Sequence, residues 1–120
     1  KKHNVACGIR QMFYKISVQT PAAGAFADIA GHGHAVEVRV YAEDPHEGFR
    51  PCTGLLTAVR FGTGHGVRVD GWVADGTEIS PFYDPLLAKV MAVGEDRTEA
   101  FDTLQTALAG TRIDGVETNA

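Results

Sequence analysis

The chain has little of what marks secreted, membrane or disulfide-rich proteins. Cysteine is scarce: Cys7 and Cys52 are the only two, and they lack the C-x-x-C spacing of a zinc or redox motif. We therefore expect free thiols in a reducing compartment rather than a disulfide framework. No apolar run approaches the roughly 18 residues of a membrane-spanning helix, and no basic segment followed by an apolar stretch marks a secretory signal. These absences predict a cytoplasmic protein without a membrane partner.

Positive charge is also scarce. The 120 residues include 11 Lys and Arg against 15 Asp and Glu, which gives a formal net charge of −4. Nucleic-acid-binding domains usually present a basic patch or stripe, and no Lys/Arg run of that density occurs here. Nucleic acid is therefore not an expected partner.

Common catalytic motifs are missing as well. No serine lies in the G-x-S-x-G context of a hydrolase nucleophile, and the sequence pairs no base with Cys52. The stretch GTGHG, residues 62–66, lacks the GK[ST] ending of a phosphate-binding loop. His32 and His34 form an i,i+2 pair without a third ligand, so no metal site is expected. An independent small-molecule enzyme is the least favoured interpretation.

What is present fits one small domain. A chain of 120 residues, 44% of them hydrophobic, suffices for a single core but not for two catalytic domains. From His34 to about Ala42, apolar and polar residues alternate as in a half-buried strand. Two further strands are predicted at residues 55–61 and 67–73, and the glycine-rich stretch between them predicts a hairpin. LLAKVMAVG, residues 86–94, suits either a strand or the start of a buried helix.

The clearest helix signal lies in DRTEAFDTLQTALAG, residues 96–110. Asp96 is the expected N-cap, Glu99 completes a capping box, and Gly110 suits the C-terminal end. Four apolar residues at helical spacing form the expected buried stripe: Ala100, Leu104, Ala107 and Leu108. The economical architecture is an α+β domain in which this C-terminal helix packs on an antiparallel β-sheet.

The strand GHAVEVRVYAEDP, residues 33–45, has an ordered polar face. Its core-facing valines alternate with Glu37, Arg39 and Tyr41, so these three side chains share the opposite side of the strand. Judged from this strand alone, that side is most simply the solvated face of an antiparallel sheet.

Five stretches together give a more specific indication: GHAVEVRVYAEDP, FRPCTGLLTAVRF, GVRVDGWV, GTEISPFYDPLLAKVMAVGEDR and TRIDGVETN. In this order and spacing they resemble the C-terminal domain of biotin carboxylase, over about Asp28 to Asn119. VDGWV followed by GTEISPFYDPLLAK is most similar to the carboxylase portion of urea carboxylase, also called urea amidolyase. We therefore predict a divergent N-terminal segment at residues 1–27 and a biotin carboxylase C-terminal-like domain at residues 28–120.

The resemblance implies a role for the polar face of the first strand. A complete biotin carboxylase uses ATP and bicarbonate to carboxylate biotin, and Arg39 matches the arginine that contacts bicarbonate and stabilises charge developing on biotin. Glu37 or Glu43 is expected to hold this arginine in place. Asp84 and Lys89 are further candidates for positioning biotin or bicarbonate.

The resemblance also implies partners. His65 and Arg68 match a segment at the dimer interface of bacterial members, so a homodimer is expected. The family's ATP-grasp portion, with its nucleotide-binding lysines and magnesium-binding glutamates, has no counterpart in this sequence. An ATP-grasp domain and a biotinylated carrier domain are therefore the expected partners. Biotin is a substrate of the complete enzyme, whereas ATP and magnesium belong to the absent domain.

Two functions remain open at this point. The first is a domain of a biotin-dependent carboxylase that binds no cofactor and is inactive in isolation. The alternative is a stand-alone binding or dimerisation module that has lost the carboxylase chemistry. In that case residues 1–30 would cover the surface that the missing domain would otherwise bury.

Overall fold

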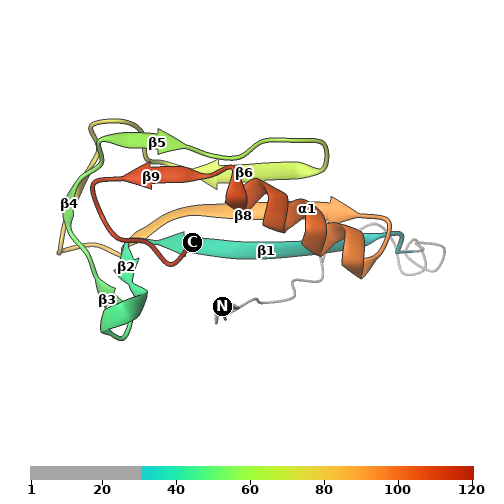
Figure 1. The fold of residues 1–120 in the computed structure, drawn as a ribbon, viewed down its shortest axis with the longest axis horizontal. Helices are drawn as coiled ribbons and strands as arrows, with labels where there is room; N and C mark the ends of the chain where they lie inside the picture. Colours follow the sequence, from blue (N-terminus) through green and yellow to red (C-terminus); the bar gives the residue numbers. More distant parts are fainter. Residues whose placement is uncertain (1–30) are drawn as a thin grey trace, which may run out of the picture.

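The computed structural model describes residues 31–120, so the predicted segment 1–27 lies outside the described part of the chain. Figure 1 shows the long strands side by side, with the single α-helix of the described part laid across them and the short strands gathered toward one end. The elements are β1 (His34–Tyr41), β2 (Glu43–Asp44), η1 (Pro45–Glu47), β3 (Arg50–Pro51), β4 (Gly54–Leu55), β5 (Ala58–Arg60), β6 (Val67–Gly71), β7 (Glu78–Ile79), β8 (Leu86–Gly94), α1 (Arg97–Ala109) and β9 (Arg112–Asp114). The predicted α+β class is confirmed.

The main sheet has three antiparallel strands in the order β1-β8-β6. The predicted alternation of β1 is confirmed, because Val36, Val38 and Val40 are buried while the residues between them are not. The run LLAKVMAVG forms the strand β8 rather than a helix. A nearly continuous apolar run suits this central position, where both edges of the strand are paired.

Helix α1 starts after Asp96, as predicted, and has 13 residues. The Asp96 carboxylate accepts a hydrogen bond from the Glu99 N–H at 2.9 Å. The Glu99 carboxylate accepts one from the Glu95 N–H at 2.7 Å, so the second bond of the capping box goes to the residue before the N-cap. Gly110 ends the helix with φ −86°, which is right-handed, so the end needs no left-handed glycine. Within residues 31–120, no helix is long and apolar enough to cross a membrane.

One hydrophobic core joins the helix to the sheet. Of the predicted helical stripe, Ala100, Leu104 and Ala107 are buried, and Leu108 is half-buried against the same core. The core continues beneath the short two-stranded ladders through Leu56, Val59, Ile79 and Leu87. The polar face of β1 lies on the other side of the sheet from this core.

The predicted hairpin between residues 55–61 and 67–73 is wrong. The first segment is divided into β4, which pairs with β7, and β5, which pairs with β9. β6 pairs with β8 instead. Gly62 explains part of this path: a Cβ there would lie 2.0 Å from the Ala107 carbonyl oxygen, so the chain leaves β5 packed closely against α1. The glycine-rich stretch therefore carries the chain past the helix rather than closing a hairpin.

Candidate functional site

The register of the main sheet gathers polar residues on the face away from α1. Arg39 of β1 lies opposite Lys89 of β8, which in turn lies opposite Asp70 of β6. In the neighbouring row, Glu37 lies opposite Met91, and Met91 lies opposite Arg68. Because side chains alternate along each strand, both rows project from the same face of the sheet. Four of the residues singled out in the sequence therefore share this face: Glu37, Arg39, Arg68 and Lys89.

Arg39 is the most accessible charged group contributed by β1. Its side chain is 51% exposed. Its Nη1 donates a hydrogen bond to the Tyr41 hydroxyl at 3.4 Å, and its Nε lies 3.7 Å from the Glu37 carboxylate. Both distances are long for such contacts, so the guanidinium keeps donors that can bind a further ligand.

The neighbours of Arg39 favour its charged form. The hydrogen bond with Tyr41 raises the pKa of Arg39 above its ordinary value, and Glu37 adds a smaller contribution. The Glu37 side chain is only 11% exposed, whereas that of Arg39 is 51% exposed. The carboxylate is therefore largely covered, while the guanidinium reaches solvent. Of the two carboxylates predicted to hold Arg39, Glu37 lies within ion-pair distance, whereas Glu43 belongs to β2 and pairs with Pro51 of β3. Arg39 therefore presents a permanent positive charge at the surface.

Arg68 and Asp70 form a second charged pair on this face. The Arg68 Nε donates to one Asp70 carboxylate oxygen at 2.9 Å, and its Nη2 donates to the other at 3.0 Å. This two-point contact fixes the plane of the Arg68 guanidinium. Arg68 is thus held by a carboxylate of its own strand, in contrast to the looser contacts of Arg39.

Two other predicted site residues lie elsewhere. Asp84 is exposed before β8, and its carboxylate accepts a hydrogen bond from the Leu86 N–H at 2.8 Å. Leu86 pairs with Tyr41, so this turn fixes the start of β8 near the end of β1 that follows Arg39. His65 lies in the glycine-rich loop before β6, where it lines a shallow pocket of about 310 Å³ against α1.

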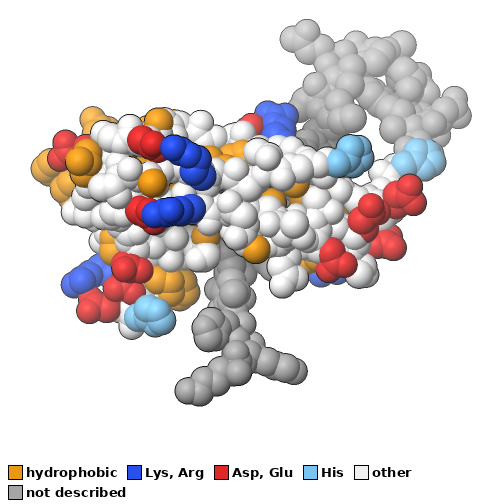
Figure 2. All heavy atoms as spheres, turned by 45° about the horizontal axis from the view of Figure 1, so that its top comes forward, with side chains coloured by type: hydrophobic (Ala, Val, Ile, Leu, Met, Phe, Trp, Pro, Cys, Tyr) orange, Lys and Arg blue, Asp and Glu red, His pale blue; other side chains and the backbone are white. Residues whose placement is uncertain are grey.

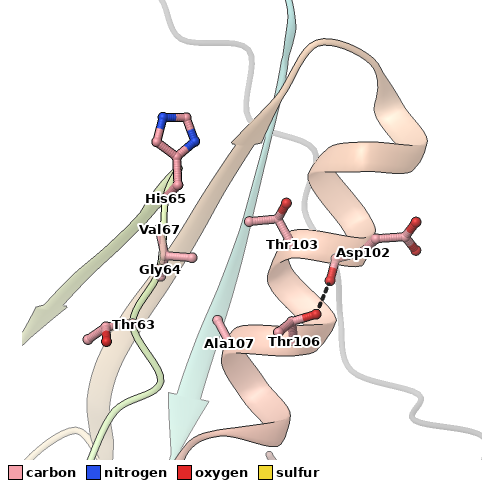
Figure 3. Close-up of a pocket in the computed structure, with 8 residues that line it drawn as sticks. All are labelled: Thr63, Gly64, His65, Val67, Asp102, Thr103, Thr106 and Ala107. Carbon is pink, nitrogen blue, oxygen red and sulfur yellow. Dashed lines mark hydrogen bonds between the residues drawn. The ribbon is translucent and has the colours of Figure 1, made fainter.

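Figure 3 shows this pocket between the loop and the helix. The imidazole of His65 points away from the helix, and the Thr106 hydroxyl donates to the Asp102 carbonyl oxygen at 2.9 Å. The threonine is thus engaged with its own helix, and the lining side chains do not converge on a common point. The pocket is a surface recess rather than a catalytic centre.

Asn119 lies beside Arg39, a contact that the sequence analysis did not predict. Its side-chain oxygen accepts a hydrogen bond from the Tyr41 N–H at 2.8 Å, and its Nδ2 donates to the Arg39 carbonyl at 3.2 Å. These residues are 78 and 80 positions away in the sequence, so no local pattern could have joined them. The only available signal was the position of Asn119 at the end of the stretch TRIDGVETN.

Hydrophobic side chains also reach the surface. Trp72, Phe82 and Tyr83 are 62%, 87% and 82% exposed, and Leu55 is 55% exposed. Figure 2 shows hydrophobic side chains gathered toward the left-hand end of the molecule, with acidic and basic side chains among them. This end combines apolar area with charged pairs, as interaction surfaces do.

Most of the chain is similar in sequence to part of known carboxylases. The family model described as the biotin carboxylase C-terminal domain matches residues 37–120. Biotin carboxylase 2 of Bacillus subtilis is 47% identical over 92 residues, which is 77% of this chain and 20% of that protein. Urea amidolyase of Saccharomyces cerevisiae is 48% identical over 88 residues, which is 73% of this chain and 5% of that protein.

Solved structures agree with these matches. The complete multifunctional pyruvate carboxylase from Rhizobium etli aligns with a TM-score of 0.75 and 44% identity, over 77% of this chain and 9% of that one. The Kluyveromyces lactis urea carboxylase aligns with a TM-score of 0.69 and 45% identity, over 73% of this chain and 8% of that one. The chain thus spans a fifth or less of the length of these relatives.

Proposed function

Because the chain belongs to the family of biotin carboxylase C-terminal domains, we propose that it supplies Arg39 to the biotin and bicarbonate site of an ATP-dependent biotin carboxylase. The observation that carries this proposal is the geometry of Arg39. Its backbone is fixed in the main sheet, while its guanidinium is half-exposed with donors left for a ligand.

The chemistry of the guanidinium supports this role. Its planar fork can donate two parallel hydrogen bonds to a planar carboxylate or bicarbonate, and its charge persists at any working pH. A fixed donor aimed at a developing negative charge stabilises the transition state more than the ground state. Arg39 would therefore bind bicarbonate and stabilise the charge that develops on biotin.

The neighbouring residues support Arg39 in different ways. Glu37, whose largely covered carboxylate lies 3.7 Å from the Arg39 Nε, would orient the guanidinium. Lys89, opposite Arg39 in the register, would add a second positive charge for an anionic substrate. Asp84 would act through the turn that starts β8, because its carboxylate holds the Leu86 N–H.

ATP and magnesium are assigned to another part of the enzyme. Among residues 31–120, no three His, Cys, Asp or Glu side chains lie together so that they could hold a metal ion. We assign the magnesium–nucleotide site to an ATP-grasp domain, and the delivery of biotin to a biotinylated carrier domain. The isolated chain is then expected to be inactive, because phosphoryl transfer needs metal ions and cationic groups around the phosphates.

Several finer points remain predictions. They are a urea-carboxylase-like parent enzyme, a cytoplasmic location, the domain boundary between residues 27 and 28, and a homodimer through His65 and Arg68. Both interface residues are exposed around the turn that enters β6, which supports the proposed contact.

A stand-alone interaction module is the second candidate function. The exposed Trp72, Phe82 and Tyr83 favour it, because aromatic side chains are enriched in protein–protein interfaces. The two functions differ in one respect: only a carboxylase domain requires Arg39 to respond to bicarbonate.

An NMR titration of the full chain with bicarbonate tests the proposal, with chloride at matched ionic strength as the salt control. We expect amide shifts at Glu37 to Tyr41 that disappear in Arg39→Ala. Arg112→Ala is the matched control variant, because Arg112 also bonds a carboxylate two residues away, that of Asp114. Shifts that persist in Arg39→Ala, or no shifts at millimolar bicarbonate, would contradict the proposed role.

A further inference from the structure

The free edge of β1 is held by a residue from the other end of the described chain. β1 is an edge strand of the main sheet, with β8 on one side. On its other side, Asn119 accepts from the Tyr41 N–H at 2.8 Å, and its side-chain amide donates to the Arg39 carbonyl at 3.2 Å. The Asn119 N–H donates to the Tyr41 carbonyl at 3.3 Å. Figure 1 shows the C-terminal segment ending beside β1, at the end of the strand that contains these residues.

These bonds lie at the point where the pairing of β1 with β8 becomes irregular. The pairing of β1 with β8 keeps a regular register from His34 to Val40, and then shifts between Val40 and Tyr41. The extra residue of this shift is Leu87 of β8, and such a shift interrupts the ladder of backbone hydrogen bonds between the two strands. Arg39 is the last side chain on the polar face before this shift. A second support at this point therefore limits how far the backbone that bears Arg39 can move.

Asn119 is well anchored for this task. β9 pairs with β5, and the chain then turns at Gly115, where φ is +109°. A Cβ at Gly115 would lie 2.1 Å from the Leu55 carbonyl oxygen, so the turn needs glycine for both space and conformation. Val116 packs against the hydrophobic core. The segment that presents Asn119 is thus tied to the body of the domain.

We propose that Asn119 is a positioning residue for Arg39: it fixes the β1 backbone at Arg39 and Tyr41 and so sets the direction of the guanidinium. The inference rests on the proposed function of Arg39 in binding bicarbonate. An amide suits the role because its oxygen accepts from one residue of the strand while its nitrogen donates to the other. The Tyr41 hydroxyl also contacts the guanidinium, at 3.4 Å. The bonds from Asn119 therefore position the backbone of Arg39 and also that of Tyr41, which bears this hydroxyl.

The variant Asn119→Ala removes both side-chain hydrogen bonds to β1, and NMR of the full chain measures the effect. We expect exchange of the Tyr41 amide hydrogen to become at least about fivefold faster, since its acceptor is lost. The Nε–H resonance of Arg39 should shift, and the bicarbonate concentration needed to perturb it should rise by about fivefold or more. Asn119→Asp keeps an acceptor for the Tyr41 N–H, so it should restore the slow exchange of that hydrogen.

Ile113→Val separates positioning from stability. Ile113 packs on the core from β9, so this variant lowers stability without removing a bond to β1. It should leave the Arg39 resonance and its bicarbonate response unchanged. If Asn119→Ala behaves like Ile113→Val in both readouts, the inference is wrong.

The two proposals fail in different ways. If the unmodified chain shows no bicarbonate response, the proposed function fails, and the Arg39 resonance and Tyr41 exchange still decide whether Asn119 holds β1. If the unmodified chain responds and Asn119→Ala responds equally, the proposed function stands and the positioning role of Asn119 is excluded.

Discussion

Arg39 combines a fixed backbone with a loosely held side chain. Tyr41 and Glu37 contact its guanidinium at 3.4 and 3.7 Å, and both raise its pKa, the hydrogen bond to Tyr41 most. A raised arginine pKa means that the group stays protonated in every working buffer. Any pH dependence of the site near neutrality must then come from other groups, such as the substrate or the partner domain.

At the residue scale, much of this polar face was predictable. Strict alternation in β1 placed Glu37, Arg39 and Tyr41 on one side, because successive side chains of a strand point to opposite faces. Asn119 was not predictable from any pattern, since it meets β1 across 78 to 80 residues of sequence. Such contacts depend on how whole elements pack rather than on local spacing.

Asp75 gives a residue-scale prediction about pH. The Arg60 guanidinium, 2.9 Å away, and then the Val59 N–H hold the pKa of the Asp75 carboxyl below its usual range. A depressed folded-state pKa contributes stability above the unfolded pKa of about 4, and this contribution is lost as pH falls through the folded value. Asp75→Asn should therefore cost stability at pH 7, and the difference from the unmodified chain should shrink by pH 3.

Urea unfolding of both proteins at pH 7 and pH 3 measures this difference. Asn keeps an oxygen that can accept from the Val59 N–H, so the comparison isolates the charge. An equal stability difference at the two pH values would show that the carboxylate charge does not act through Arg60.

At the scale of elements, prediction was correct where the signal was local. The capping residues Asp96 and Glu99 and the apolar stripe marked α1, and alternation marked β1. The hairpin prediction was wrong because the three-residue strand β9, too short to give a periodic signal, pairs with β5. β6 instead completes the main sheet beside β8. Pairing between distant strands depends on the shared core, which a local turn signal does not report.

Substitution of Gly62 tests how closely the glycine-rich loop, residues 62–66, packs against α1. In Gly62→Ala the new Cβ would meet the Ala107 carbonyl at 2.0 Å, so the loop or α1 must shift. We expect a loss of about 1–3 kcal/mol in the free energy of unfolding, as for other overpacked sites.

Gly64→Ala is the control in the same loop. A Cβ there would lie 3.9 Å from the nearest Val67 atom, which is ordinary contact, so the change should stay within about 0.5 kcal/mol. Thermal or urea unfolding compares the two variants. Equal effects would show that loop flexibility, rather than contact with α1, governs this position.

At the scale of the whole molecule, the chain corresponds to a small part of the length of its relatives. The chain covers 20% of Bacillus subtilis biotin carboxylase 2 and smaller shares of the Saccharomyces cerevisiae urea amidolyase and the Rhizobium etli pyruvate carboxylase. Its polar sheet face and its exposed aromatic residues lie open in the described part of the chain. Both are suited to meet other domains, which is why we assign the complete reaction to an assembly.

Carboxylation of free biotin by the full chain, mixed with the ATP-grasp part of biotin carboxylase 2, directly tests the proposed role of Arg39. Sedimentation first establishes that the two associate. We expect ATP- and bicarbonate-dependent formation of carboxybiotin that falls by about 100-fold or more in kcat with Arg39→Ala, as when a single transition-state donor is removed. Arg112→Ala should retain the full rate. An associated mixture that forms no carboxybiotin, or one whose rate is unchanged by Arg39→Ala, would contradict the proposed function.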